Sequence, residues 1–372
     1  MTRGQEMATK LERVRQLIHQ QNLGGILLRA RSNFAWITGG GLSYINAASE
    51  TGVGAMLVTA DRVFLVSNNI ETRRLLEEEL AGLTVDLIEY PWAQADGESR
   101  AMARVLPTGK TLGIDIAFGG GGGLLMGDAI RNLRVPMLEP EIERYRAHGK
   151  LTTELTERVC RQIEPGMSEH DVAAMIHAAF MPHDVRVPVY LIAADDRIDT
   201  RRHPISKGRK IQDRVMVVVC AEAHGLWTNL TRLVSFRVPD AQTKLKHRAV
   251  AQVDVTANAA TKPGRTFGEI FAEIVAEYDR QGFGEQWRLH HQGGSTGYDG
   301  RDVFATPACP SVVCVNQAFA WNPSITGAKS EDTMIVRADG IEWLTQAGAG
   351  WPVLEIERGG VTYRRPDIWV KA

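Results

Sequence analysis

The spacing of apolar residues along the first part of the chain predicts helices that alternate with strands. Apolar side chains recur at helical spacing over 11–21, and a continuous apolar run at 25–28 predicts a buried strand. Two further runs, 53–59 and 62–66, flank a short polar turn and predict a hairpin. Charged amphipathic spacing over 71–80 predicts another helix. This alternation is typical of an α/β domain with a parallel or mixed sheet.

The rest of the chain predicts a second domain that combines long helices with a curved antiparallel sheet. The segment 138–146 marks the boundary, because Pro140 suits the first turn of a helix and acidic residues follow it. This long helix is predicted to run to about residue 162. Ser168 and Asp171 are spaced almost as a capping box for the next helix. The remaining elements are predicted to be strands at 185–193, 215–221 and 230–236 and helices at 241–261 and 266–281. We therefore predict an α+β protein with domains 1–138 and 139–372.

Composition excludes several classes of function. The 372 residues include 43 basic and 44 acidic side chains, so a net charge of −1 gives no electrostatic basis for binding nucleic acid. The apolar runs, such as 215–220, fall far short of the ~20 residues that a membrane-spanning helix needs. The first residues lack the apolar core of a signal peptide, and the four cysteines show no CxxC spacing. We therefore expect a cytoplasmic protein with reduced thiols and no membrane partner.

A run of five glycines at 119–123 invites comparison with phosphate-binding loops. It lacks the Lys-Ser/Thr pair that such a loop needs, and its glycines do not form a clear dinucleotide-binding fingerprint. Because glycine tolerates almost any backbone conformation, we interpret the run as a surface turn without a function.

The segment 217–232 resembles a metal-binding hairpin from which the metal ligands have been removed. It reads Val-Val-Val-Cys-Ala-Glu-Ala-His-Gly-Leu-Trp-Thr-Asn-Leu-Thr-Arg. This is similar to the hairpin of the pita-bread metallopeptidases, in which two aspartates eleven positions apart hold a pair of divalent metals. Alignment places Val218 and Asn229 at those positions (229 − 218 = 11). A valine cannot donate to a cation, and an Asn offers one neutral carbonyl where a bridging carboxylate is needed.

The resemblance extends over essentially the whole chain. The first domain is similar to the creatinase N-terminal domain, and the segments 140–146, 164–169 and 330–333 match family motifs. The resemblance implies a pita-bread fold for the C-terminal domain and a creatinase-like α/β fold for the N-terminal one. The five metal ligands of the peptidases correspond here to Val218, Asn229, His290, Asn322 and Glu331. One remaining Glu cannot offset the ~4 positive charges of two divalent ions, so we predict that the chain holds no metal or other cofactor.

Creatinase, a metal-free member of the same family, supplies a pattern for the site residues. His203 in Arg-His-Pro-Ile resembles its acid/base histidine, and His290 and Arg301 match the pair that holds the substrate carboxylate. Glu331 matches a second carboxylate of its site. Thr231 departs from the pattern, because creatinase has a Glu there that binds the substrate's guanidinium. Creatine is therefore not the expected substrate.

These residues also have structural interpretations. His203 suits a surface loop, and Arg301 suits a salt bridge with a neighbouring aspartate. If His290 and His291 lie on a strand, their side chains point to opposite faces, and we expect His290 to face the site. Cys220 would need an aimed base to act as a nucleophile, which makes it a weak candidate. Apart from the catalytic pair His203 and Glu331, the substrate-binding set is predicted to be His290, Arg301, Asn229, Asn322, Arg232 and Trp227.

The leading hypothesis is a metal-independent hydrolase that cleaves a C–N bond, in an amide, lactam or amidine, of a small metabolite carrying a carboxylate. His203 is predicted to act as general acid/base, and Glu331 to orient or activate water. One alternative is a metal-dependent Xaa-Pro aminopeptidase or dipeptidase with degenerate ligands. Another is a catalytically inactive pita-bread module used for binding, and a lyase or cyclase on the same frame stays open. The family resemblance further implies a homodimer.

Overall fold

The computed structural model describes residues 1–117 and 122–371, which form two compact units. The units are Met1–Glu141 with His224–Leu226, and Ile142–Ala223 with Trp227–Ala372. The first unit therefore ends after Glu141 rather than after the predicted residue 138. Glu141 lies in the first turn of the helix that begins at Glu139, and it forms a buried ion pair with Lys10 at 2.9 Å.

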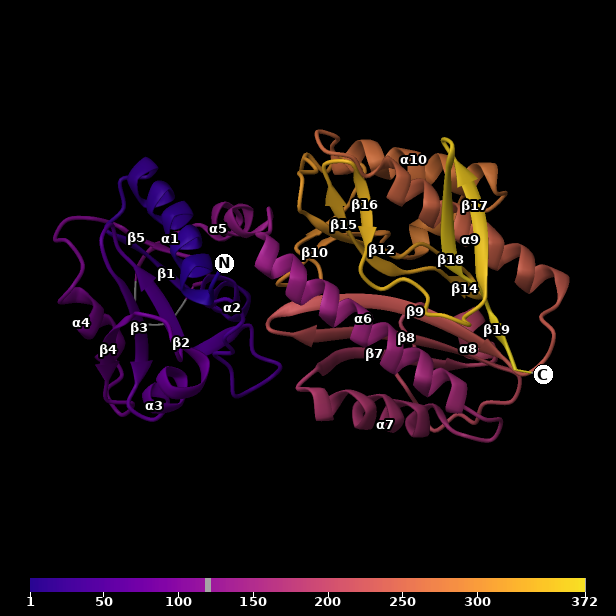
Figure 1. The fold of residues 1–372 in the computed structure, drawn as a ribbon, viewed down its shortest axis with the longest axis horizontal. Coiled ribbons are helices and arrows are strands. Elements are labelled where there is room, and N and C mark those ends of the chain that lie inside the picture. Colours follow the sequence, from indigo (N-terminus) through magenta and orange to yellow (C-terminus); the bar gives the residue numbers. More distant parts are fainter. Residues whose placement is uncertain (118–121, 372) are drawn as a thin grey trace. The chain divides into compact units, whose positions relative to one another are not determined.

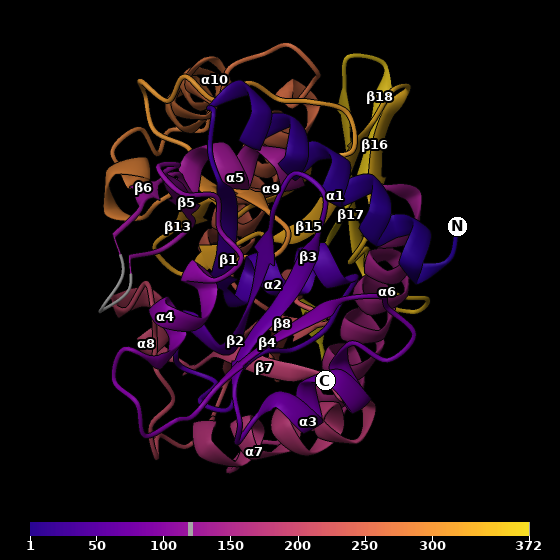
Figure 2. The same ribbon diagram turned by 90° about the vertical axis from the view of Figure 1, so that its left-hand side faces the viewer.

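The first unit is built on a six-stranded mixed sheet, as the alternating pattern predicts (Figure 2). The strand order is β4-β3-β2-β1-β5-β6, in which β2 pairs antiparallel with β1 and β3 and the other pairs are parallel. The predicted hairpin is confirmed, because Val58 lies opposite Val63 in β2 and β3. The strands are β1 Gly25–Ala30, β2 Thr51–Val58, β3 Val63–Asn68, β4 Asp86–Tyr90, β5 Leu112–Ile114 and β6 Leu124–Leu125. The helices are α1 Arg3–Gln20, α2 Arg31–Thr38, α3 Thr72–Arg74, η1 Leu75–Glu79, α4 Gly97–Ala103 and α5 Gly127–Arg134.

Helix α1 begins well before the predicted residue 11. Thr2 caps it: its hydroxyl accepts a hydrogen bond from Gln5 N at 3.2 Å, and the Gln5 side chain accepts one from Thr2 N at 2.8 Å. The apolar spacing does not extend into the early turns of α1, because two of the buried side chains there, Glu6 and Lys10, are charged. These two pair with each other at 2.6 Å, so they are buried without being apolar.

Two other expectations for this unit have different outcomes. The predicted helix at 71–80 forms, but it is divided into the short α3 and the π-helical turn η1. The glycine run at 119–123 lies largely outside the described residues. No described helix, in either unit, combines the length and the apolar character needed to cross a membrane.

The two larger sheets of the second unit are each covered on the outer side by a pair of helices, and two-stranded sheets pair β13 with β14 and β17 with β18 (Figure 1). Helices α6 and α7 pack on the sheet β19-β9-β8-β7, and α9 and α10 pack on the sheet β11-β10-β12-β15-β16. Each pair of layers has its own apolar core. The helices are α6 Glu139–Gln162, α7 Glu169–Phe180, η2 Met181–His183, α8 Asp196–Thr200, α9 Ala241–Ala260, α10 Phe267–Arg280 and η3 Gln286–Leu289.

The strands of the second unit agree with the predicted runs and add several short ones. Their bounds are β7 Arg186–Ala194, β8 Arg214–Ala223, β9 Leu226–Ser235, β10 Gly293–Thr296, β11 Val303–Phe304, β12 Ala318–Trp321, β13 Ser324–Ile325, β14 Ala328–Lys329, β15 Asp332–Arg337, β16 Gly340–Trp343, β17 Val353–Arg358, β18 Val361–Pro366 and β19 Trp369–Val370. The capping box of α7 is confirmed, because Ser168 Oγ accepts from Asp171 N at 3.1 Å while the Asp171 carboxylate accepts from Ser168 N at 2.7 Å.

Strands β8 and β9 form the hairpin that the sequence motif predicts. Two residues connect them, His224 and Gly225, with φ angles of 52° and 76°. Positive φ at both positions is what a tight two-residue hairpin turn requires, and glycine supplies it without strain. The hairpin carries Val218 on β8 and Asn229 on β9.

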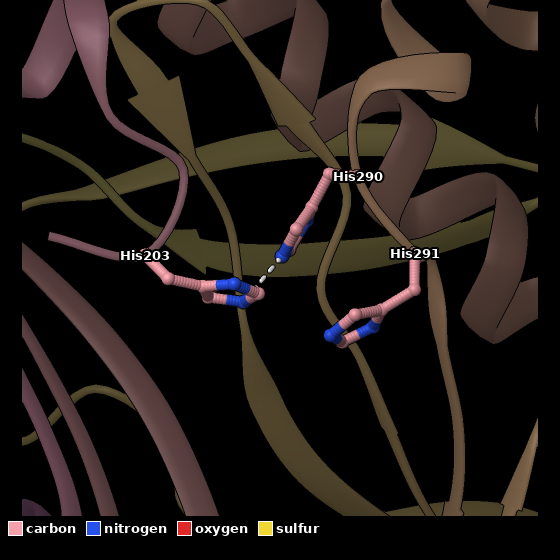
Figure 3. A group of neighbouring side chains, drawn as sticks. All are labelled: His203, His290 and His291. Atoms are coloured by element: carbon pink, nitrogen blue, oxygen red, sulfur yellow. Dashed lines mark hydrogen bonds between the residues drawn. The ribbon is translucent and has the colours of Figure 1, made fainter.

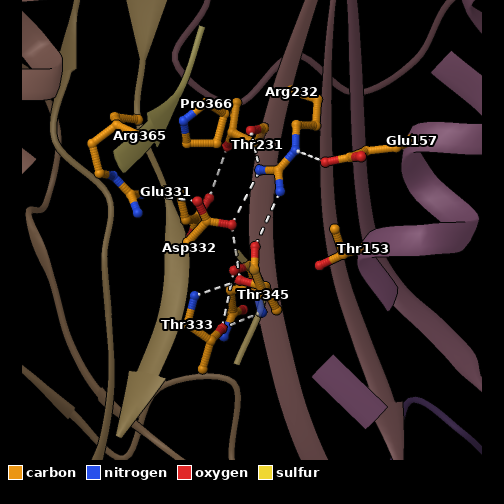
Figure 4. Close-up of polar contacts among 12 residues, drawn as sticks. Thr153, Glu157, Thr231, Arg232, Glu331, Asp332, Thr333, Thr345, Arg365 and Pro366 are labelled. Carbon is orange, nitrogen blue, oxygen red and sulfur yellow. Dashed lines mark hydrogen bonds and ion pairs between the residues drawn. The ribbon is translucent and has the colours of Figure 1, made fainter. Parts of the chain in front are cut away.

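Two buried arginines tie the layers of the second unit together (Figure 4). Arg232 of β9 pairs with Glu157 of α6 at 2.9 Å and with Asp332 of β15 at 3.1 Å. Arg365 of β18 pairs with the same Asp332 at 2.9 Å and with Asp254 of α9 at 2.7 Å. All five side chains are at most 2 % exposed. The network therefore fixes strand β9 against strand β15.

Replacing Arg232 by Ala is expected to lower the free energy of unfolding by about 3–5 kcal/mol, because Glu157 and Asp332 would lose a buried partner for their charges. Urea unfolding followed by circular dichroism measures the loss. Arg237→Ala is the control, since Arg237 pairs with Asp213 on the surface, where the expected loss stays below about 1 kcal/mol. Similar small losses for both variants would contradict the role given to Arg232.

Candidate functional site

A cavity of about 360 Å³ lies in the second unit and collects most of the predicted site residues. The strands β7, β8 and β9 supply one group of lining side chains, and the segments around β10, β12 and β15 supply the other. The lining residues are Val189, Leu191, His203, Val218, Cys220, Trp227, Asn229, His291, Gly300, Arg301, Phe304, Asn322, Lys329 and Glu331.

Part of the lining is apolar. Val218 lies opposite Leu191 in the register of β8 and β7, and both belong to a buried apolar cluster. Trp227 adds an indole that packs against the backbone at Gly300, where a Cβ atom would come within 3.3 Å of the ring. The cavity therefore offers an apolar surface to the body of a ligand, and Val218 stands where a metal ligand is expected in the peptidases.

Glu331 is the one carboxylate among the lining residues, and two cations hold it. Arg301 donates to its Oε1 at 2.8 Å, and Lys329 donates to its Oε2 at 2.7 Å. The Thr231 hydroxyl also donates to Oε2, at 3.0 Å. All three charged side chains are less than 10 % exposed. Arg301 therefore forms a salt bridge, but its partner is Glu331 and not one of the neighbouring aspartates.

These contacts favour the ionised form of Glu331 at neutral pH. Burial alone would raise its pKa, but Lys329 and Arg301 outweigh burial and lower the pKa to about 2. An ionised carboxylate with such a low pKa and with both oxygens engaged is a weak proton acceptor. The geometry therefore favours a role in orienting the two cations over the predicted activation of water.

The charged residues of the lining leave one positive charge in excess. Arg301 and Lys329 contribute two positive charges and Glu331 one negative charge, which gives a net formal charge of +1. The Nε of Arg301 is buried and has no hydrogen-bond partner among the described residues. A cavity of this charge and with an unused N–H donor is suited to a ligand with one carboxylate.

Asn229 and Asn322 place neutral acceptors in the same cavity. Asn229 is fully buried, and its backbone is held by Thr333, whose hydroxyl accepts from Asn229 N at 2.7 Å. Asn322 is 3 % exposed. The Oδ1 atoms of both have no hydrogen-bond partner within the described part of the chain. Because an unpaired buried acceptor is costly, these oxygens are suited to accept N–H groups of a ligand.

The five positions that hold two metals in the peptidases do not fit two metals here. Val218 offers no donor, and the two asparagines offer neutral oxygens. Glu331 is neutralised by Arg301 and Lys329, whose charges would also repel incoming cations. The donor set therefore cannot provide the anionic ligands that a dinuclear centre requires.

The loop that follows α8 brings His203 to the cavity. The neighbouring Arg202 fastens this loop by donating to Ser324 Oγ at 3.1 Å, Gln286 Oε1 at 2.6 Å and Thr326 Oγ1 at 2.9 Å. His203 itself is exposed, and its Nε2 lies 3.1 Å from Nε2 of His290. His203 therefore lies on a surface loop, as the structural interpretation predicts, and it also lines the cavity, as the functional interpretation requires.

The two adjacent histidines do not diverge as expected. His290 follows the 3₁₀ turn η3, and His291 precedes β10, so neither lies in a strand and the alternation of a strand does not apply. Their ring centroids are 4.4 Å apart, and both rings gather near His203 (Figure 3). His291 lines the cavity, whereas His290 lies outside the lining set. The expectation that His290 alone faces the site is therefore wrong.

The surroundings favour the neutral form of all three imidazoles. Burial lowers the pKa of His203 and of His290, and the nearby Lys329 lowers both further. Burial and Arg301 lower the pKa of His291 to about 4. Each ring therefore keeps one nitrogen with a free lone pair. Cys220 is a poor nucleophile in the same cavity, because burial raises the pKa of its thiol to about 12.

Arg232 is located away from the cavity. Its fully buried guanidinium is occupied by Glu157 and Asp332, so we assign it to the ion-pair network and not to substrate binding. Among the polar residues of the lining, His291 and Lys329 were not selected as site residues from the sequence. The signal for Lys329 was its position two residues before Glu331: Lys329 ends β14, and Glu331 directly precedes β15.

Comparison with known proteins identifies the class of this fold. The sequence profile of metallopeptidase family M24 matches residues 143–338, and that of the creatinase/prolidase N-terminal domain matches residues 10–118. The Xaa-Pro dipeptidase of Pyrococcus horikoshii is 21 % identical over 356 residues, which covers 91 % of this chain and 97 % of the relative. The probable dipeptidase PepE of Mycobacterium bovis is 26 % identical over 259 residues, or 67 % of each chain.

The solved structures agree with this result. The prolidase from Pyrococcus horikoshii OT3 has a TM-score of 0.76 at 18 % identity and covers 92 % of this chain and 99 % of its own. The second unit is thus a pita-bread domain in an α+β protein, preceded by a creatinase/prolidase-type N-terminal domain. The chain belongs to metallopeptidase family M24.

The low pKa of Glu331 predicts a pH-dependent contribution to stability. A carboxyl whose pKa falls from 4.5 to about 2 on folding contributes about 3 kcal/mol above pH 4.5, and this contribution is lost as the pH falls toward 2. The difference in unfolding free energy between the wild type and Glu331→Gln is therefore expected to shrink by about that amount between pH 6 and pH 2. Urea unfolding of both proteins across this range measures it.

Glu355→Gln is the matched control for this measurement, because Glu355 forms only an exposed pair with Arg364. Its stability difference from the wild type is expected to stay small throughout the pH range. A gap between the wild type and Glu331→Gln that did not change with pH would contradict the low pKa of Glu331.

Proposed function

We propose that this chain hydrolyses a C–N bond, in an amide, lactam or amidine, of a small metabolite that carries one carboxylate. The reaction would proceed without the two-metal centre of the family. The proposal depends most on one observation: the cavity that replaces the metal site keeps a net charge of +1 and two unpartnered amide oxygens. Such a lining suits a ligand with one anionic group and at least one N–H group.

Different lining residues would contact different parts of the substrate. Lys329 and the free Nε of Arg301 would bind the carboxylate, with Glu331 holding both cations in place. The Oδ1 atoms of Asn229 and Asn322 would accept hydrogen bonds from the N–H groups beside the scissile bond. The apolar wall around the Trp227 indole would contact the remaining carbon atoms.

His203 is the proposed acid/base. As a neutral imidazole it can accept a proton from water while the water oxygen attacks the carbon of the C–N bond. When that bond breaks, the imidazolium returns the proton to the leaving nitrogen. His203 reaches the cavity from an exposed loop, so solvent water has access to it. The histidine thus ends the cycle neutral, and the products are an amine together with a carboxylic acid from an amide or lactam, or with an amide from an amidine.

The alternative of an Xaa-Pro dipeptidase is supported by the names of the relatives. It would need a metal centre, and the donors at the five ligand positions argue against that centre. A binding module without catalysis would also retain the fold. It would not explain why an exposed histidine lies beside a cavity whose net charge of +1 suits a carboxylate ligand. We further propose a cytoplasmic homodimer, on the basis of the family resemblance and the four free cysteines.

Chelator treatment separates the hydrolase from the dipeptidase. Protein dialysed against EDTA is expected to release amine or ammonia from at least one member of a panel of N-acetyl amino acids, N-carbamoyl amino acids and lactam carboxylates. Added Mn²⁺ is not expected to be required. Cleavage confined to Xaa-Pro dipeptides, and only in the presence of Mn²⁺, would overturn the proposal. Absence of turnover combined with tight binding of one carboxylate would favour the binding module.

His203→Gln is expected to lower kcat on the substrate found in this way by about 10²–10⁴-fold, because a positioned general base contributes that much. Its KM should change little, since the carboxylate contacts are retained. His183→Gln is the control, because His183 is exposed and lies outside the cavity lining. Steady-state kinetics measures both variants, and a His203→Gln protein with wild-type kcat would reject the assigned base.

Lys329→Met is expected to raise KM by about 10–100-fold, the loss of one charge-assisted hydrogen bond to a carboxylate. The same change should not affect binding of the corresponding substrate amide, which lacks the negative charge. Lys207→Met, at an exposed position, serves as the control. Equal effects of Lys329→Met on the carboxylate and the amide would show that Lys329 acts only on folding.

A further inference from the structure

The three histidines beside the cavity form a cluster with the donor set of a metal site (Figure 3). Their candidate ligand nitrogens on His203, His290 and His291 all lie within 4.8 Å of one another. We propose that these three imidazoles bind one divalent transition-metal ion of the zinc class. This site shares only His290 with the five ligand positions of the peptidases and needs none of the lost carboxylates.

The distances within the cluster are close to those of a bound ion. Two imidazole nitrogens at ~2.05 Å from a tetrahedral zinc ion stand about 3.3 Å apart. Nε2 of His203 and Nε2 of His290 stand 3.1 Å apart, so this pair already has the required separation. No separation exceeds 4.8 Å, so the widest would have to shorten by at most about 1.5 Å. His203 is on an exposed loop, so a rotation of its side chain can supply much of this movement.

The surroundings of the cluster orient its rings for binding. Nδ1 of His290 lies 3.2 Å from Ser324 Oγ, which holds the ring with Nε2 directed toward His203. Ser324 also accepts from Arg202, so one hydroxyl connects the two segments that carry these histidines. Such partners of the second ring nitrogen are usual for metal-binding histidines. Nδ1 of His291 is buried and has no hydrogen-bond partner among the described residues.

The chemistry of the donors selects the class of ion. Three neutral imidazoles suit Zn²⁺, Co²⁺, Ni²⁺ or Cu²⁺, whereas Mg²⁺ and Ca²⁺ require oxygen ligands. Lys329 and Arg301 lie close enough to His203 and His291 to lower their pKa values, so they would also weaken the binding of a cation. His203 and His291 both line the cavity, so the fourth position of the ion would face it and take water or an anion.

Occupation of this site has a consequence that rests on the proposed function. A metal ion bound to His203 takes the lone pair with which this imidazole would accept a proton from water. The metal-loaded enzyme is therefore expected to be inactive in the reaction proposed above, and removal of the ion should restore activity. The site would thus make the enzyme sensitive to free zinc, while the binding of the ion itself does not depend on that function.

A titration of the EDTA-dialysed full-length protein with Co²⁺ tests the site directly. We expect one ion per chain, with the visible absorption bands of imidazole-bound Co²⁺, and displacement of these bands by one equivalent of Zn²⁺. His203→Gln and His291→Gln are each expected to weaken Co²⁺ binding at least about tenfold. His183→Gln should bind as the wild type does. Thermal unfolding of each variant shows whether a loss of binding is a loss of fold, and His203 lies on an exposed loop where misfolding is not expected.

The outcomes separate the metal site from the proposed function. Absence of Co²⁺ bands, or bands that persist in both His→Gln variants, would overturn the metal site and leave the hydrolase proposal untouched. Stoichiometric binding with full turnover in the presence of Zn²⁺ would keep the site but reject both the inhibition and the role of His203 as base. Binding accompanied by loss of turnover, reversed by EDTA, is the result that we expect.

Discussion

The salt bridges of Glu331 with Arg301 and Lys329 determine whether this pita-bread cavity can bind metal ions. In this family the corresponding carboxylate belongs to a set that holds two metals, and its negative charge is needed for that purpose. Here two cations of the protein itself neutralise it, at 2.8 and 2.7 Å. Because a buried charge must be paired, removing Glu331 would leave both cations uncompensated. The residues Val218 and Asn229 and the two cations beside Glu331 therefore act in the same direction, against a dinuclear metal centre.

The ion-pair network behind the cavity makes this arrangement rigid. Arg232 joins β9 to Asp332, which follows Glu331 directly in the chain, and Arg365 joins Asp332 to α9. The first residue of β15, Asp332, therefore directs its carboxylate to the ion-pair network, while Glu331, just before the strand, directs its carboxylate to the cavity. The scaffold arginine is retained where the peptidase hairpin also has one, while the metal ligands beside it have changed. Of these two neighbouring residues, Asp332 therefore stabilises the fold and Glu331 belongs to the cavity.

Much of the fold follows from local patterns, whereas the site depends on packing that the sequence does not reveal. The β8–β9 hairpin and the capping box of α7 were predicted correctly because turn and cap residues act within a few positions. The start of α1 was missed because its buried residues Glu6 and Lys10 are charged. His291 was assigned to the wrong face because a strand was assumed at 290–291, where the chain has an irregular segment between the turn η3 and strand β10. The pairing of Lys329 with Glu331 depends on side-chain direction between β14 and β15, which their two-residue spacing alone does not specify.

The central claim is that the old metal position no longer accepts cations. A crystal of the protein soaked in Mn²⁺ and measured at the manganese absorption edge tests this most directly. We expect no anomalous peak among Asn229, Asn322 and Glu331, because Arg301 and Lys329 already neutralise the one carboxylate there. Two anomalous peaks beside Glu331, with its side chain turned away from Arg301 and Lys329, would contradict the account.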